Sequence, residues 1–248
     1  MKGLIMAGGL STRLKPITND LPKSLVKIGE RTILGRIIDS LLEHKVKDLV
    51  IITGYLEKEI KKFVKKNYPN LKPTYVFNPK YQNTKIRYIY AMYLAEDALR
   101  GDDVLYIHGD VFCDPILIKR LVRFPHSGAL VNKSFVSEKD FNARVKNGLI
   151  TEIGVKVYGK GTGFCLPVYK LLRNDFKLWL EKIGEYVEKS NLDCYAENAL
   201  NEVLGRIKLY PVYFGQEIGM EIDDFEDLKK AEGFLKSGLI SFSKSFKL

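Results

Sequence analysis

Residues 2–13 read KGLIMAGGLSTR, an apolar run that stops at two glycines and continues with hydroxyl and basic side chains. Leu4-Ile5-Met6 predicts a short buried strand that the glycines end. A glycine-rich loop at the carboxyl end of a parallel strand lets backbone N–H groups approach phosphate closely, and Arg13 adds a positive charge. The loop matches neither GxGxxG nor GxxxxGK[ST], so ordinary dinucleotide-binding and P-loop interpretations lose support.

Beyond this loop, apolar periodicity predicts strands that alternate with helices through the first half of the chain. Strands separated by helices of ten or more residues pair in parallel through right-handed crossovers, which indicates a doubly wound α/β sheet. In the first half we expect strands at 49–52, 74–77 and 104–107 and helices at 33–45, 57–66 and 86–99. In the second half we expect short strands over 128–166, helices at 168–189, 196–204 and 225–235, and strands at 207–214 and 220–222.

The charge balance is unusual: 40 Lys+Arg against 30 Asp+Glu give a net charge of +10 over 248 residues. Such an excess fits a phosphate-rich partner, whether nucleic acid, membrane surface or small metabolite, and equally fits a lysine-rich soluble surface. With 46% hydrophobic and 28% charged residues, wholesale disorder and fibrous classes are excluded. Cys113, Cys165 and Cys194 form no CxxC pair or zinc spacing, so a reducing cytoplasm is the simplest setting. We expect no signal peptide and no membrane insertion.

Two carboxylates are expected at strand ends that face the same cleft. Asp110 follows the apolar strand 104–107, at the mouth of the sheet where ligands of this architecture bind. Asp223 follows another short strand, and a carboxylate pair supplies the hard oxygens that Mg²⁺ prefers. The neighbouring Asp114 and Asp224 each precede a helix and are expected to be N-caps. Lys23 follows Pro22 and is expected in a loop, because the residue before a proline avoids helical geometry.

These segments, in this order, resemble the nucleotidyltransferase family that makes nucleotide-activated sugars and phosphoalcohols. The resemblance rests on residues 2–13, Pro22-Lys23, Gly109-Asp110 and 220–228. The chain is similar to the small members that activate phosphocholine or inositol phosphate with CTP, through residues 78–81, 90–95, 162–164 and 195–200. It departs from the pattern at Ser11, where a glycine is common, and at 85–88, a segment usually richer in asparagine.

The resemblance implies Mg²⁺-dependent transfer of a nucleotidyl group from an NTP, with CTP favoured, to a small phosphomonoester, with release of pyrophosphate. Arg13 is expected to clamp the leaving phosphates and Lys23 to bridge the α-phosphate and the acceptor, while Asp110 and Asp223 hold the metal. The implied nucleotide-binding residues are Ala7, Gly8, Gly9, Ser11, Thr12, Asn78 and Thr84. The implied acceptor-binding residues are Gly163, Tyr195 and Glu197, although Glu197 fits a first-turn acid beside a helix dipole equally well.

The implied fold is an α/β, three-layer α/β/α Rossmann-like sandwich with a mainly parallel mixed sheet and a small substrate-side β/α extension. We expect one domain over 1–236, with about 1–125 as the nucleotide-binding half, about 126–236 as the acceptor-binding half, and 237–248 as a polar basic tail, partly mobile. The expected partners are an NTP and a small phosphorylated acceptor, without specific nucleic acid, and a homodimer is the assembly considered. The alternatives are a nucleotide-sugar glycosyltransferase and a catalytically silent regulatory protein on the same scaffold.

Several other polar and aromatic positions have simpler explanations. His44, His108 and His126 form no cluster in the sequence and are expected to be non-catalytic. Trp179 lies at helical spacing among apolar residues and is expected in the core. The lysines of 61–66 are expected on a solvated helix face. Among the basic residues, we expect Arg13 and Lys23 to be the principal phosphate ligands, with Lys85 and Arg87 as further candidates.

Overall fold

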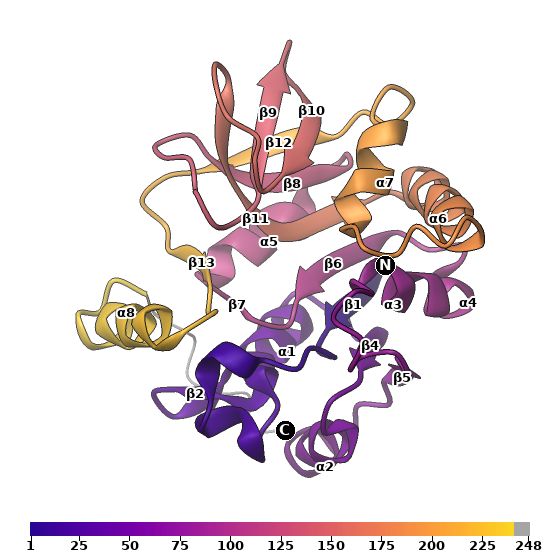
Figure 1. Cartoon of the computed structure of the whole chain (residues 1–248). Helices are drawn as coiled ribbons and strands as arrows, with labels where there is room; N and C mark the ends of the chain where they lie inside the picture. The colour runs from indigo at the N-terminus through magenta and orange to yellow at the C-terminus, as the bar shows by residue number, and fades with distance from the viewer. Residues whose placement is uncertain (241–248) are drawn as a thin grey trace.

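The computed structural model describes residues 1–240, and within them the largest element is a nine-stranded sheet (Figure 1). Its main path runs β10-β9-β11-β6-β1-β4-β5, and β8 and β12 continue from β11. The strands are β1 (Lys2–Met6), β4 (Leu49–Thr53), β5 (Thr74–Phe77), β6 (Val104–His108), β8 (Gly128–Asn132), β9 (Asn142–Lys146), β10 (Leu149–Gly154), β11 (Thr162–Leu171) and β12 (Tyr210–Phe214). Two small ribbons pair β2 (Lys27–Ile28) with β3 (Arg31–Thr32) and β7 (Val111–Cys113) with β13 (Gly219–Glu221).

The N-terminal half of the sheet is parallel. β1 pairs in parallel with both β4 and β6, and β4 pairs in parallel with β5. Successive side chains of a strand point to opposite faces, and in β1 Leu4 and Ile5 accordingly belong to different apolar cores. Both faces are therefore covered, as parallel sheets require.

Helices cover the two faces as two separate groups, which completes three layers. One core packs against α1 (Ile33–Glu43), α2 (Glu57–Asn67) and α5 (Pro115–Arg123). The other packs against α3 (Ile89–Leu94), α4 (Glu96–Leu99), α6 (Arg173–Glu188) and α7 (Ala196–Val203). The expected α/β/α sandwich with a mixed sheet is confirmed. Trp179 is fully buried in the second core, as expected.

The C-terminal half is antiparallel and corrects two predicted boundaries. β11 pairs antiparallel with β6, β8 and β9, so it joins the parallel half to the extension. The helix predicted over 168–189 was wrong at its start, because Val168, Tyr169 and Leu171 belong to β11 and α6 begins at Arg173. The helix predicted over 86–99 is two shorter helices that begin at Ile89 and meet at Ala95.

The remaining elements are the C-terminal helix α8 (Phe225–Lys236) and three short 3₁₀ turns. α8 begins at its N-cap Asp224, and α5 begins at its N-cap Asp114, as expected. Three short 3₁₀ turns follow β1: η1 (Thr12–Leu14), η2 (Ile17–Asn19) and η3 (Lys23–Leu25). Within the predicted tail 237–248, Ile240 is buried in the first core, and 241–248 lie outside the described residues.

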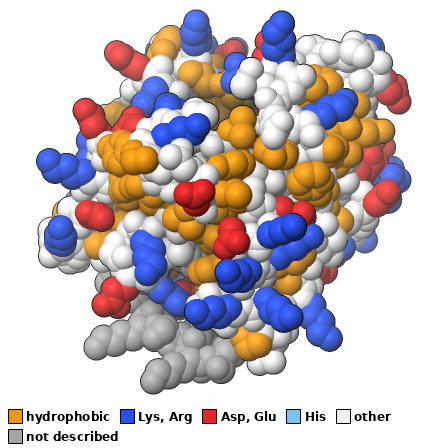
Figure 2. All heavy atoms as spheres, turned by 60° about the horizontal axis from the view of Figure 1, so that its bottom comes forward, with side chains coloured by type: hydrophobic (Ala, Val, Ile, Leu, Met, Phe, Trp, Pro, Cys, Tyr) orange, Lys and Arg blue, Asp and Glu red, His pale blue; other side chains and the backbone are white. Residues whose placement is uncertain are grey.

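The surface carries basic, acidic and apolar side chains on the same face (Figure 2). On the face shown in Figure 2, basic side chains lie among acidic and apolar ones, and several basic side chains gather in the lower right part of the view. The lysines of 61–66 are exposed on α2, as expected for a solvated face. In the described part of the chain, no helix is long and apolar enough to cross a membrane.

Candidate active site

A cavity of about 530 Å³ opens where the parallel strands β1, β4 and β6 end. Its walls come from the loop after β1, from η3, from the turn between β6 and β7, and from the segment before α8. This is the edge of an open α/β sheet where ligands bind, because the carboxyl ends of parallel strands leave a crevice between diverging loops. The expected loop residues Ala7, Gly8, Gly9, Ser11 and Thr12 all line this cavity.

The loop after β1 needs glycine because it packs backbone against backbone. A Cβ at Gly8 would lie 3.0 Å from the carbonyl carbon and oxygen of Thr53, and a Cβ at Gly54 would lie 2.5 Å from the Gly8 oxygen. Ser11 has a φ of 55°, in the left-handed region that glycine adopts most readily. Its carbonyl oxygen accepts a hydrogen bond from the Thr18 hydroxyl at 2.7 Å, which holds the turn.

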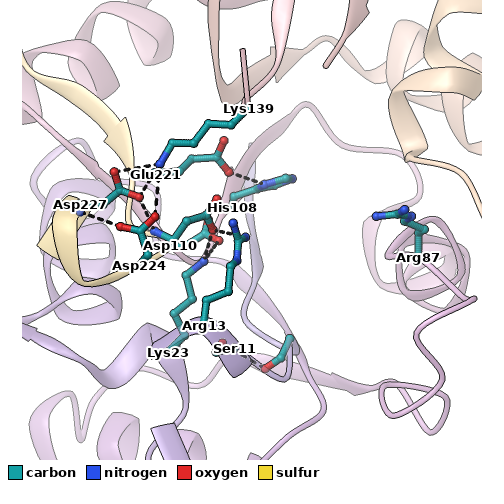
Figure 3. A network of polar contacts seen from close by, with 12 residues as sticks. Ser11, Arg13, Lys23, Arg87, His108, Asp110, Lys139, Glu221, Asp224 and Asp227 are labelled. Carbon is teal, nitrogen blue, oxygen red and sulfur yellow. Dashed lines mark hydrogen bonds and ion pairs between the residues drawn. The ribbon is translucent and has the colours of Figure 1, made fainter. Parts of the chain in front are cut away.

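Two cations and two carboxylates meet on the cavity wall (Figure 3). Lys23 Nζ donates to Asp110 Oδ2 at 2.6 Å and to Asp223 Oδ1 at 2.7 Å. Arg13 Nη2 lies 2.9 Å from the same Asp223 oxygen. The Lys23 side chain is 13% exposed and that of Arg13 is 62% exposed, so one cation is embedded and the other reaches into the opening. The structure thus brings together the four residues that the sequence singled out, from segments far apart in the chain.

The charges of this cluster stabilise one another. Burial disfavours the charge of Lys23, but Asp110 and Asp223 hold the pKa of its ammonium above the ordinary value. Burial likewise raises the pKa of Asp110, and Lys23 outweighs that effect and lowers it. Both groups are therefore charged at neutral pH. Among the described residues, Asp110 Oδ1 is buried without a hydrogen-bond partner, so a hard, ionised oxygen remains available to a cation.

His108 and Glu221 stand beside this cluster, and the sequence reasoning missed both. His108 Nδ1 lies 3.3 Å from Glu221 Oε1, and its Nε2 lies 2.6 Å from the Tyr106 hydroxyl. One ligand atom each from His108, Asp110 and Glu221 lie within 4.8 Å of one another. Burial raises the pKa of Glu221 to about 7, and the contact with Glu221 raises the pKa of His108 against the effect of burial.

His108 was expected to belong to no cluster, but it lines the cavity and lies beside Asp110 and Glu221. A signal was present in the sequence: His108 ends the same strand that delivers Asp110, and Glu221 lies just before Asp223. The antiparallel pairing of β13 with β7 places Glu221 opposite Val111 and so beside the end of β6.

A second ion-pair network, formed by Lys139 with Asp224 and Asp227, supports the backbone of Asp223. Lys139 Nζ donates to both carboxylate oxygens of Asp227, at 3.0 and 2.8 Å, and lies 3.7 Å from Asp224. Asp227 Oδ2 in turn accepts the backbone N–H of Asp223 at 3.1 Å. Figure 3 shows the Lys139 side chain reaching toward Asp227 and Asp224 at the start of α8. The backbone that carries Asp223 is therefore fixed by a nearly buried carboxylate.

The remaining predicted residues separate into two groups. Asn78 and Tyr195 line the cavity, as expected of ligand-binding residues. Thr84, Gly163 and Glu197 are not among its lining residues. Thr84 is exposed, and a Cβ on Gly163 would lie 2.4 Å from the Asn132 carbonyl oxygen, which explains that glycine by strand packing.

Glu197 lies behind the cavity wall. Its side chain accepts a hydrogen bond from the Tyr88 hydroxyl, and the residue is 1% exposed. Burial raises the pKa of this carboxyl group. Tyr88, which the sequence reasoning did not select, is the residue that faces the cavity at this position.

The family assignment comes from comparisons with known proteins. Residues 2–152 match the family model described as Nucleotidyl transferase. Choline-phosphate cytidylyltransferase of Streptococcus pneumoniae is 24% identical over 246 residues, which cover 96% of this chain and 99% of that relative. The bifunctional IPC transferase and DIPP synthase of Aquifex aeolicus is 28% identical over 241 residues, which cover 94% of this chain and 51% of that longer protein.

Solved structures show the same fold. A CTP:phosphocholine cytidylyltransferase from Streptococcus pneumoniae has a TM-score of 0.80 at 22% identity, with 94% of this chain and 98% of that chain covered. The inositol-1-phosphate CTP transferase from T. maritima has a TM-score of 0.76 at 17% identity, with 97% and 98% covered. Because the family model spans more than half of the chain, and relatives align along nearly all of it, this chain belongs to the nucleotidyl transferase family and is an enzyme of the nucleotidyltransferase class.

Proposed function

We propose that the protein transfers a nucleotidyl group from an NTP, with CTP favoured, to a small phosphomonoester and releases pyrophosphate. The observation that carries this proposal is the cluster of Arg13, Lys23, Asp110 and Asp223 on one cavity wall, beside a glycine-rich loop. The preference for CTP is supported by relatives whose names state cytidylyl transfer to choline phosphate and inositol 1-phosphate. As part of the proposal, about 1–125 bind the nucleotide and about 126–236 bind the acceptor.

In the proposed reaction, an oxygen of the acceptor phosphate forms a bond to the α-phosphorus as the bond to the bridging oxygen of pyrophosphate breaks. The nucleophile is already an anion, so the enzyme needs no general base. The barrier comes from repulsion between phosphates and from the need for an in-line approach. Positioned positive charge is what such a site must supply.

The two cations suit two different tasks. Arg13 is exposed at the cavity mouth, and its planar fork of N–H donors suits the oxygens of the departing pyrophosphate. Lys23 is embedded between two carboxylates that keep it protonated, so it would present a fixed point charge between the α-phosphate and the acceptor phosphate. The backbone N–H groups of Gly8 and Gly9, in the loop that lines the cavity, would receive phosphate oxygens.

Asp110 and Asp223 are the residues that would hold Mg²⁺. Their fit rests on the chemistry of the donor set: two carboxylates on one wall, with Asp110 Oδ1 buried and unpaired among the described residues. When bound, the ion would polarise the α-phosphate and neutralise part of its charge. Asp227 fixes the backbone of Asp223, so the carboxylate is held in place before any ligand arrives.

Pyrophosphate release tests the proposal. The purified protein is assayed with Mg²⁺ across the four NTPs, each combined with phosphocholine, inositol phosphate, glycerol phosphate and hexose 1-phosphates. We expect acceptor-dependent release with at least one pair, and loss of turnover by roughly 10²–10³-fold in Asp110→Asn with the fold retained. Release without an acceptor, or near wild-type turnover in Asp110→Asn, contradicts the proposal. Incubation with nucleotide sugars tests the glycosyltransferase alternative in the same series.

A further inference from the structure

Arg87 lies across the cavity from the Arg13–Lys23 pair and belongs to none of the networks described above (Figure 3). Its guanidinium carbon lies 4.7 Å from the centroid of the Tyr195 ring, and its Nη1 donates to the Tyr195 hydroxyl at 3.2 Å. Its Nε lies 3.3 Å from Asp193 Oδ1. The backbone N–H of Arg87 donates to the Leu192 carbonyl at 2.9 Å. The side chain is therefore anchored to the segment before α7 and still 44% exposed to the cavity and solvent.

Tyr195 is the centre of an aromatic wall. Its ring centroid lies 5.1 Å from that of Phe141 in an edge-to-face arrangement, and 5.8 Å from that of Tyr88. An aromatic wall of this kind attracts a cation to the ring face through the ring quadrupole, and quaternary ammonium groups are bound in this way. Here the chain supplies the cation itself, because the Arg87 guanidinium already stacks on Tyr195. An acceptor with a cationic end would lose that ring face and meet a positive charge.

The cavity also suits hydroxyl groups. Arg87 offers N–H donors, and the carboxylates of Asp140 and Glu221, which line the cavity elsewhere, offer acceptor oxygens. One oxygen of each carboxylate is engaged, by Ser137 and His108 respectively. A hydroxyl both donates and accepts, so it pairs with either kind of group. A trimethylammonium group has no N–H or O–H bond, so its contacts here are electrostatic only: the carboxylates attract it and Arg87 repels it.

We propose that Arg87 is a specificity-determining residue of the acceptor site: it excludes phosphomonoesters with a quaternary ammonium end and selects those that carry hydroxyl groups. This inference rests on the proposed function and adds the chemical class of acceptor. Acceptors with a quaternary ammonium end are disfavoured because the Arg87 guanidinium occupies the Tyr195 ring face and repels a second cation. Acceptors with hydroxyl groups are favoured because the guanidinium donates hydrogen bonds to them. Repulsion of one ligand and attraction of the other together give the specificity.

The test compares two acceptors of opposite chemistry, inositol 1-phosphate and phosphocholine, in the wild type, Arg87→Ala and Lys85→Ala. Lys85→Ala is the matched control: Lys85 was the other further candidate for a phosphate ligand, but the structure places this cation of the same segment at the surface and outside the cavity lining. We expect the wild type to favour inositol 1-phosphate by at least roughly 10-fold in kcat/KM. Arg87→Ala should reduce this ratio by roughly 10-fold or more through the KM of both acceptors, while Lys85→Ala leaves it unchanged. The KM for CTP should stay within about twofold in both variants.

A binding measurement makes the result independent of turnover. Titration calorimetry of each acceptor with the same three proteins gives the dissociation constants directly, and Arg87→Gln serves as a second variant if Arg87→Ala folds poorly. The proposal is overturned if the wild type binds phosphocholine more tightly, if both acceptors change equally in Arg87→Ala, or if neither acceptor binds. Selective binding without pyrophosphate release would instead count against the proposed function and leave the selectivity of Arg87 standing.

Discussion

Replacing Lys23 with methionine removes the charge that separates two carboxylates while keeping most of the side-chain volume. In the wild type, Nζ lies 2.6 Å from Asp110 Oδ2 and 2.7 Å from Asp223 Oδ1. Without the ammonium, two like charges roughly 5 Å apart repel by about 3 kcal/mol at an effective dielectric constant of about 20. For a protein of this size, that loss lowers Tm by roughly 6–12 °C. The lost cation should also lower kcat by roughly 10²–10³-fold.

Thermal unfolding in EDTA and pyrophosphate release in Mg²⁺ measure the two effects separately. Lys65→Met is the matched control, because Lys65 is exposed on α2 and its loss should change stability by less than about 0.5 kcal/mol. In Lys23→Met/Asp110→Asn the repulsion is gone, so we expect Tm to recover most of its loss while activity does not. The reasoning is refuted if Lys23→Met unfolds at the wild-type temperature in EDTA, or if the double variant is less stable than Lys23→Met.

Three further predictions concern the elements around the cluster. Gly54→Ala should lower Tm and turnover, because its Cβ would lie 2.5 Å from a backbone oxygen of the glycine loop, whereas Gly9→Ala, with open space around it, should leave Tm unchanged. Burial raises the pKa of Glu57, but hydrogen bonds from a lysine and a threonine lower it below its ordinary value. The ionised Glu57 side chain therefore stabilises the folded protein above about pH 4.5, and this contribution is lost as the pH falls further. Glu57→Gln should therefore cost about 0.5–1 kcal/mol in urea unfolding at pH 7 and less at pH 3; an equal cost at both would argue against the ion pair. Asp227→Asn should lower kcat by roughly 10-fold with little change in the KM for NTP, since it loosens the backbone of a proposed metal ligand; a change in KM alone would contradict a positioning role.

The sequence predicts those site residues whose position depends on their immediate neighbours in the chain. Asp110 follows an apolar strand and Arg13 follows a glycine-rich turn, so both could be placed near the sheet edge. Lys23 was expected in a loop after Pro22, and the structure corrects this: Lys23 begins the short 3₁₀ helix η3. The structure brings them together because parallel strands β1 and β6 end side by side. The same logic explains why Asp114 and Asp224 could be assigned as caps, since their role depends only on the residues that follow.

The part that could not be predicted depends on contacts between distant segments. His108 becomes a cavity residue only through Glu221, which a separate ribbon delivers. The resemblance assigned Glu197 to the acceptor, with a first-turn acid as the equal alternative; it does lie in the first turn of α7, and its side chain is directed behind Tyr88. Val168 and its neighbours were assigned to a helix because a short apolar run fits either structure, and only pairing with β6 and β8 decides for a strand.

In the proposed reaction, this cavity moves the α-phosphoryl group of an NTP, with its nucleoside, onto a phosphomonoester. CTP labelled at the α-phosphorus and CTP labelled at the γ-phosphorus test it in parallel reactions with an accepted acceptor. We expect the α-label in an acceptor-linked product and the γ-label in pyrophosphate, both at rates that fall together in Lys23→Met. Release of the γ-label as orthophosphate, or an α-label that never reaches the acceptor, would contradict it.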